Sequence, residues 1–189
     1  MEIKKALEKI WNPEIKEMTS KIYDENKEAF VKVPASLSKK YHSGETIQTH
    51  VEFALEWLFL IMNEFSLSAI EKDYLISATI LHDVSNVVNA STEPNPEEFQ
   101  KLYPTGYFRS QEAYVYHPTL SAFVIGKYIL DTKKNIPELI KVAKLIESHM
   151  SHWLKGYNPE PIDLLEFILC TADYLSTRKD LPKMENDKK

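Results

Sequence analysis

The chain has 189 residues, of which 43% are apolar and 27% charged, a composition typical of one soluble globular domain with a hydrophobic core. Its four glycines form neither a GxGxxG nor a GxxxxGK[ST] string, which excludes the usual glycine-rich dinucleotide and nucleotide loops. The net charge of −5 argues against a general electrostatic hold on long duplex nucleic acid. It does not exclude a nucleotide or a short strand, because bound metal ions would reverse the local field.

The sequence predicts a cytoplasmic protein. Cys170 is the only cysteine, so no disulfide can form within the chain, as expected in a reducing compartment. Residues 1–20 are charged and amphipathic and lack the apolar segment of a signal peptide. The longest apolar stretches are shorter than a membrane span, so we expect no membrane segment. Nothing in the sequence indicates the oligomeric state.

Nearly every segment repeats its apolar residues at the period of an α-helix. Residues 2–11 predict the first helix, and Pro13 marks the start of a second, which continues to residue 30. A loop is expected over residues 31–45, followed by a long helix over residues 46–65.

Ser68 predicts the start of the next helix, because Ser68 and Glu71 have the spacing of a capping box. This helix extends to about Val84 and is apolar on most sides, so we expect it at the centre of the fold. Residues 86–116 contain three prolines among polar residues and predict a long loop with one helical turn or none. The last three helices are predicted over residues 118–130, 137–152 and 162–177.

The predicted fold class is therefore all-α. We expect a short helical extension over residues 1–33, a core domain over residues 34–178 and a charged tail over residues 179–189.

Several histidines and aspartates stand at apolar parts of the predicted helices. His82 and Asp83 follow the apolar run 75–81, and Asp173 follows the run 164–172. A carboxylate is costly to bury unless it is paired or bound to a metal. One histidine alone is more often a surface or satisfied core residue, but the set taken together favours a shared metal cluster. The candidate ligands are His50, His82, Asp83, His117, His149 and Asp173.

Imidazole and carboxylate donors without thiolates suit Mn, Fe, Co, Ni, Zn or Mg ions. Six donors exceed the needs of one tetrahedral site, which indicates two divalent ions. Two ions a few ångströms apart can hold a bridging hydroxide and clamp a phosphoryl group. A protein nucleophile is then not required, and the chain contains no GxSxG motif.

The order His50, His82–Asp83, Asp173 resembles the H…HD…D pattern of the HD-domain phosphohydrolase superfamily, and the intervening histidines resemble its two-metal members. The stretch from Pro34 to His50 is similar to the segment before the first ligand in HD-type 3′–5′ exoribonucleases and in the HD domains of bacterial tRNA nucleotidyltransferases. Residues 172–178 (ADYLSTR) resemble the closing motif of many HD proteins.

The resemblance implies one metal on His50, His82, Asp83 and Asp173. It implies a second metal on His117 and His149, with Asp83 bridging both ions and orienting the hydroxide. His42 would then lie near the mouth of the site and contact a phosphate, and His152 would be an outer-shell partner, since it lies on the face of His149.

Many relatives continue the HD pair with Ile-Gly-Lys, whereas this chain continues with Val84-Ser85-Asn86. Asn86 offers a neutral amide in place of a cation. Lys40, Arg109 or Arg178 are candidate replacements for the phosphate contact, although each is more often a solvated surface charge.

The segment 99–116 is rich in aromatic residues and should border the metal site, since it joins the HD pair to His117. Tyr107 and Arg109 combine a ring with a cation, as stacking on a base and holding a phosphate require. The alternative is that these rings only pack the segment onto the domain.

These observations favour an enzyme in which a metal-activated hydroxide hydrolyses a phosphodiester in a nucleotide or short nucleic acid. A nucleotide phosphomonoesterase or (d)NTP hydrolase is one alternative, and a non-catalytic nucleotide-binding HD module is another. A third is a subunit that regulates a partner through the amphipathic residues 1–30.

Overall fold

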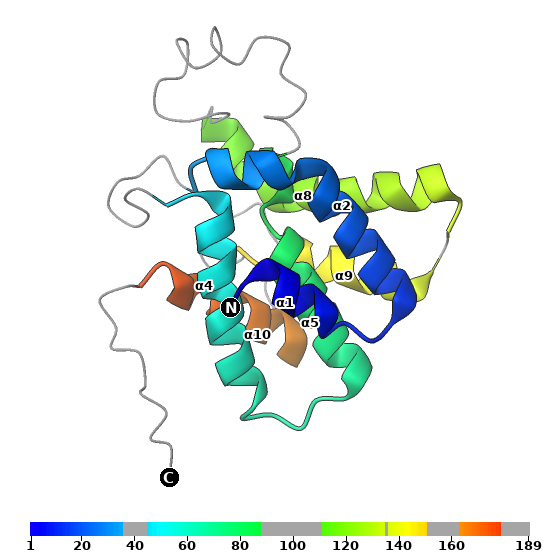
Figure 1. Ribbon diagram of the computed structural model, residues 1–189, viewed down its shortest axis with the longest axis vertical. Helices are drawn as coiled ribbons and strands as arrows, with labels where there is room; N and C mark the ends of the chain where they lie inside the picture. The colour runs from blue at the N-terminus through cyan, green and yellow to red at the C-terminus, as the bar shows by residue number, and fades with distance from the viewer. Residues whose placement is uncertain (36–44, 88–110, 135, 151–162, 179–189) are drawn as a thin grey trace, which may run out of the picture.

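A computed structural model describes residues 1–35, 45–87, 111–134, 136–150 and 163–178. Over these residues the chain is α-helical, and the one pairing of extended backbone is an isolated bridge between Pro34 and Thr46. The all-α prediction is therefore confirmed (Figure 1). The helices are α1 (Ile3–Glu8), α2 (Pro13–Lys32), α4 (Ile47–Met62), α5 (Ala69–Leu81), α8 (Gln111–Thr132), α9 (Pro137–Ser148) and α10 (Leu164–Ser176).

Helix α5 lies at the centre of the bundle, as its apolar sequence predicts. Every residue from Leu75 to Leu81 is buried, and the helix contacts α1, α2, α4, α9 and α10. Helix α4 packs beside α10, and α8 packs along α9. A helix that is buried on all sides keeps its ends in fixed positions relative to its neighbours, so α5 delivers the residues after Leu81 to one defined place.

The helix starts follow local capping chemistry. Ser68 and Glu71 form the predicted capping box. The Ser68 hydroxyl oxygen accepts from the Glu71 backbone N–H, and the Glu71 carboxylate accepts from the Ser68 backbone N–H. Asn12 caps α2 with its side-chain oxygen, and Pro13 occupies the first turn as predicted. Thr46 caps α4, which fixes the start of the helix three residues before His50.

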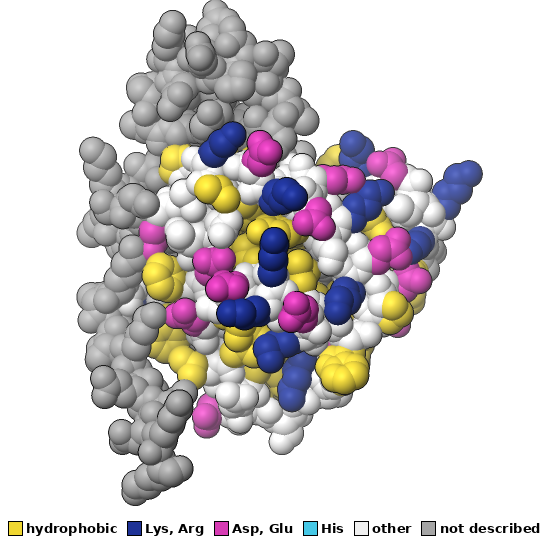
Figure 2. Space-filling model, in the orientation of Figure 1, with side chains coloured by type: hydrophobic (Ala, Val, Ile, Leu, Met, Phe, Trp, Pro, Cys, Tyr) yellow, Lys and Arg dark blue, Asp and Glu magenta, His cyan; other side chains and the backbone are white. Residues whose placement is uncertain are grey.

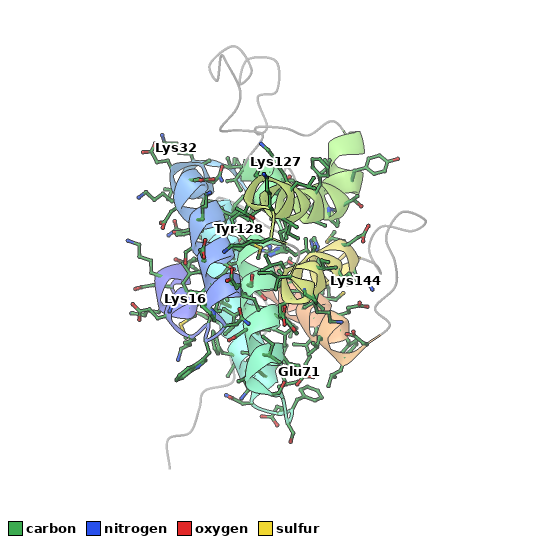
Figure 3. All side chains as sticks on the ribbon, turned by 90° about the vertical axis from the view of Figure 1, so that its right-hand side faces the viewer. Lys16, Lys32, Glu71, Lys127, Tyr128 and Lys144 are labelled. Atoms are coloured by element: carbon green, nitrogen blue, oxygen red, sulfur yellow. The ribbon has the colours of Figure 1, made fainter. Side chains whose placement is uncertain are left out.

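Helices α1 and α2 are attached to the centre of the bundle through Asp73 of α5. Its buried carboxylate accepts the backbone N–H groups of Trp11 at 3.0 Å and of Asn12 at 2.7 Å. The turn between the two helices is therefore bonded directly to α5. On the other side of α2, the Tyr128 hydroxyl of α8 donates to Glu17 at 3.4 Å, and Figure 3 shows Tyr128 beside α2.

Helix α8 differs from the sequence prediction. A loop was expected up to residue 116 and a helix from Pro118, but α8 begins at Gln111 and contains Pro118. His117 therefore lies within a helix. Proline is usual in a first helical turn but lacks the N–H that an interior position donates. Packing of α8 along α9 outweighs this loss, a tertiary effect that local sequence does not reveal.

The face that α1 and α2 present to solvent carries lysines interspersed with acidic side chains, and no histidine is visible on it (Figure 2). The helices in the described part of the chain all lack the combination of length and apolar character that a membrane crossing needs.

Candidate metal centre

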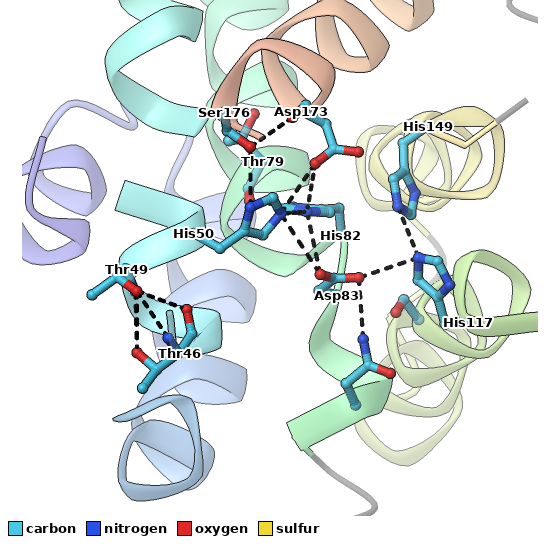
Figure 4. A network of polar contacts seen from close by, with 12 residues as sticks. Thr46, Thr49, His50, Thr79, His82, Asp83, His117, His149, Asp173 and Ser176 are labelled. Carbon is cyan, nitrogen blue, oxygen red and sulfur yellow. Dashed lines mark hydrogen bonds and ion pairs between the residues drawn. The ribbon is translucent and has the colours of Figure 1, made fainter. Parts of the chain in front are cut away.

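Helix ends and interiors bring the six predicted ligands together inside the bundle (Figure 4). His50 lies in the first turn of α4, and His82 and Asp83 form the turn that follows α5. His117 comes from α8, His149 directly follows α9, and Asp173 lies on α10. All six are buried, with at most 6% of each residue exposed.

One half of the cluster is formed by His50, His82 and Asp173. The Nε2 atoms of the two histidines are 3.0 Å apart. Asp173 Oδ1 lies 3.1 Å from Nε2 of His50 and 3.5 Å from Nε2 of His82. Three donor atoms from three helices or helix ends thus face a common point.

The other half is formed by His117 and His149, whose Nε2 atoms are 3.2 Å apart. The rings of His82 and His149 are adjacent, with centroids 4.9 Å apart, so the two halves are continuous. His82, Asp83 and His149 also present donor atoms close enough to share a metal ion.

Asp83 stands between the halves and directs one carboxylate oxygen to each. Its Oδ1 is 3.2 Å from Nε2 of His117. Its Oδ2 is 3.7 Å from Nε2 of His50 and 3.6 Å from Nε2 of His82. In Figure 4 the dashed lines from Asp83 run to both sides. This is the arrangement that a bridging carboxylate requires.

Hydrogen bonds on the far side of the rings fix which nitrogen is free to bind a metal. Nδ1 of His82 lies 2.8 Å from the Thr79 carbonyl, and Nδ1 of His149 lies 2.6 Å from the Ile146 carbonyl. A carbonyl can only accept, so both Nδ1 atoms carry hydrogen. In the neutral rings, Nε2 is then a bare lone pair directed into the cluster.

Ser176 fixes His50 in the same way. The Ser176 hydroxyl donates its one hydrogen to the Asp173 carbonyl at 2.6 Å. Its oxygen therefore accepts from Nδ1–H of His50, 3.0 Å away, so in the neutral ring Nε2 of His50 carries no hydrogen.

These donors fit a divalent metal. In the neutral rings the Nε2 lone pairs of His50 and His82, 3.0 Å apart, repel each other, so a proton or a metal ion must lie between them. Two ligands at right angles, each about 2.1 Å from an ion, are about 3.0 Å apart, close to the spacings of both histidine pairs. Imidazole and carboxylate donors suit the first-row divalent ions and Mg²⁺.

Comparison with known proteins agrees with this geometry. A family model of the HD domain matches residues 40–178, which include all six residues of the cluster. The chain belongs to the HD domain family. Membership places it in the superfamily of metal-dependent phosphohydrolases, which are generally hydrolytic and bind divalent metals. A search of curated proteins and a search of solved structures gave no match.

The histidines and aspartates of the cluster shift one another's pKa values in this HD domain. Burial lowers the pKa of His82, but the carboxylates of Asp83 and Asp173 outweigh it and raise that pKa to about 9. Burial and the charges of His82 and His117 lower the pKa of His149 to about 3. Burial opposes ionisation of the two aspartates, yet the surrounding histidines hold the pKa of each well below its usual range. Without metal, the cluster therefore keeps its carboxylates ionised and a proton on His82.

The predicted substrate contacts are only partly described. Asn86 is buried and its amide donates to Asp83 Oδ1 at 3.2 Å, so it supports the central carboxylate. Arg178 lies just beyond α10, where its guanidinium donates to the Tyr174 hydroxyl at 2.9 Å. The remaining candidates, His42, Tyr107, Arg109 and Lys40, lie outside the described residues, as does the outer-shell candidate His152.

Sequence reasoning missed three buried serines that support the ligands. Ser176 contacts His50, Ser85 donates to the backbone carbonyl of His117, and Ser121 bonds to Ser85. A serine carries no charge and occurs at many helix positions. The one available signal was position, since Ser176 follows Asp173 by three residues and Ser85 follows Asp83 by two.

Proposed function

We propose that this HD-domain protein hydrolyses a phosphodiester bond in a nucleotide or short nucleic acid, using two divalent metal ions held by the six clustered residues. The observation that carries the proposal is Asp83, whose two oxygens are directed at two separate histidine pairs. A centre for a single ion would not need a carboxylate between two such pairs.

The residues fall into two ligand sets that share Asp83. His50, His82 and Asp173 would hold one ion, and His117 and His149 would hold the other. When bound, such a pair of ions lowers the pKa of water and offsets the charge of a phosphoryl group and its leaving oxygen.

The chain's own contribution is preorganisation. Backbone carbonyls and Ser176 hold three imidazoles with hydrogen on Nδ1, so no ring must rotate or move a proton between its own nitrogens to turn Nε2 toward a metal. The amide of Asn86 fixes the orientation of the Asp83 carboxylate. Burial of all six residues lowers the local dielectric and strengthens each interaction with a charged ligand.

Phosphodiesters are the preferred class because the order of the six residues resembles the two-metal members of the family. A pair of ions would stabilise the attacking and the leaving oxygen at phosphorus. The test is a panel of cyclic nucleotides, short oligonucleotides, nucleoside monophosphates and dNTPs, assayed with Mn²⁺. We expect turnover of a diester, and a loss of at least about 100-fold in kcat/KM in Asp83→Asn, which keeps the size of the side chain but loses its charge.

The matched control is Asp73→Asn. Asp73 is also a buried aspartate, but it lies on α5 and its described hydrogen bonds go to the turn between α1 and α2 and not to the cluster. This variant should retain kcat/KM below its unfolding temperature. Turnover of monophosphates or dNTPs alone would instead favour the phosphomonoesterase or (d)NTP hydrolase. No turnover of any substrate class would contradict both hydrolase assignments.

One observation favours a second candidate, a nucleotide-binding module without turnover. The segment after Asp83 places Asn86, rather than a cation, next to the cluster. Tight binding of a nucleotide to the metal-loaded protein without product formation would support that candidate.

A further inference from the structure

Ser85 bonds the segment that follows Asp83 directly to α8. Residues 84–87 form a short helical turn, and all four are buried. From this turn Ser85 reaches across to Ser121 and to the backbone of His117, two positions on the same helix.

The hydrogen bonds of this contact have defined directions. The Ser85 N–H donates to Ser121 Oγ at 3.1 Å, and the Ser121 hydroxyl donates back to Ser85 Oγ at 3.0 Å. The Ser85 hydroxyl then donates to the His117 carbonyl at 3.1 Å. Each hydroxyl hydrogen has one acceptor, so the Ser85–Ser121 pair forms a closed set of bonds that ends on a candidate metal ligand.

Helix α8 needs such support at this point. Pro118 directly follows His117, offers no backbone N–H, and crowds the preceding turn with its ring. The helix's own hydrogen bonds therefore hold this part of α8 less firmly than a proline-free stretch. Ser85 and Ser121 are only 3% and 0% exposed, so bulk water does not readily replace a deleted hydroxyl.

Both ends of the contact adjoin the same side of the cluster. Ser85 follows Asp83 by two residues, and its acceptor is His117 itself. Asp83 Oδ1 and His117 Nε2 lie 3.2 Å apart, so a shift of α8 relative to the turn would change this spacing first. The described contacts of Ser85 and Ser121 do not involve His50, His82 or Asp173.

We propose that Ser85 and Ser121 are positioning residues for the ion held by His117 and His149, and that losing either one weakens that ion alone. This inference rests on the proposed two-metal function. The expected loss of affinity is confined to one ion, because the ion at His50, His82 and Asp173 should still bind as tightly as in the wild-type protein.

The test is titration of the full-length, metal-free protein with Mn²⁺. Calorimetry measures the affinity for each ion, and electron paramagnetic resonance detects coupling between neighbouring ions. The wild-type protein should bind two ions and give a spin-coupled spectrum. Ser85→Ala should keep one ion unchanged, bind the second about 10- to 100-fold more weakly, and lose the coupled spectrum at equal metal. Ser121→Ala should do the same, and the double variant should be no worse than either single one, because the two serines act as a unit.

The matched control is Ser77→Ala. Ser77 is fully buried on α5, and its hydroxyl bonds to Thr19 Oγ1 of α2 at 2.6 Å, so this variant also deletes a buried hydroxyl–hydroxyl bond between helices. Thr19 retains its own bond to the Ile15 carbonyl. Ser77→Ala should bind both ions like the wild-type protein.

The outcomes separate the two claims. A wild-type protein that binds fewer than two ions contradicts the two-metal function, and the inference fails with it. Two ions in the wild-type protein and unchanged affinities in Ser85→Ala and Ser121→Ala overturn the inference alone. Equal weakening of one ion in Ser77→Ala also overturns it, because general loosening of α5 would then explain the effect. Circular dichroism establishes that each variant is folded before titration.

Discussion

At the scale of single residues, the hydrogen bond at Nδ1 of an imidazole determines whether its Nε2, which faces the cluster, carries hydrogen. Ser176 is the clearest case, because its hydroxyl hydrogen is committed to the Asp173 carbonyl and its oxygen must accept from His50. It thus joins two candidate ligands of the same ion. Without it, Nδ1 of His50 has no serine acceptor, and the tautomer with hydrogen on Nε2 becomes accessible.

We therefore expect Ser176→Ala to weaken binding of one Mn²⁺ ion by about 10- to 100-fold, as measured by calorimetry. Nitrogen NMR of the metal-free protein should show His50 shifting toward the Nε2–H tautomer. Ser148→Ala is a close control, since Ser148 is also a buried helical serine that donates to the carbonyl three residues before it. Equal losses in both variants would refute a specific role for Ser176.

Metal binding should also release a proton. The pKa of His82 in the metal-free protein is raised to about 9, so the ring is protonated at pH 7 and must lose that proton before Nε2 can bind an ion. Affinity should therefore fall as pH falls, by about tenfold per unit below pH 9, and level off above it. Calorimetry in buffers of different ionisation enthalpy measures the released proton, and the same apparent enthalpy in every buffer would contradict this expectation.

The candidate ligands could be predicted from sequence, whereas their supports could not. Asp83 and Asp173 stand out because an ionised carboxylate beside an apolar run is costly without a partner. The tautomer of His50 depends on Ser176, which is distant in sequence and comes close only after α4 packs against α10. No local pattern encodes that contact.

At the scale of elements, helix starts that depend on neighbouring capping residues could be predicted from sequence, whereas a helix that continues through a proline could not. The starts of α2 and α5 follow from Asn12–Pro13 and from Ser68–Glu71, which act within a few residues. The predicted start of α8 at Pro118 was wrong, since the helix begins at Gln111. Long-range packing of α8 on α9 outweighs the helix-breaking tendency of Pro118.

Asp73 provides a stability test at this scale. Asp73→Ala removes the acceptor of two backbone N–H groups in the turn between α1 and α2 and should lower the free energy of unfolding by roughly 2–4 kcal/mol. Urea denaturation measures the change. Asp73→Asn keeps one carbonyl oxygen and should lose less. A loss of similar size in the two variants would show that the charge, rather than the hydrogen bonds, holds the turn.

At the scale of the whole molecule, the bundle brings the functional ends of its helices to one buried place. Helix α5 supplies the central turn, α4 and α10 complete one half of the cluster, and α8 and α9 complete the other. The HD family match begins at residue 40, after α1 and α2. The division into an extension over residues 1–33 and a core over residues 34–178 stays a prediction, although both early helices contact α4 and α5.

The central claim is that two ions occupy one cluster with Asp83 between them. Anomalous diffraction from crystals of the full-length protein soaked in Mn²⁺ tests it most directly. We predict two peaks on either side of Asp83, one contacting His50, His82 and Asp173, and the other contacting His117 and His149. A single peak, or peaks away from these residues, would contradict the two-metal centre.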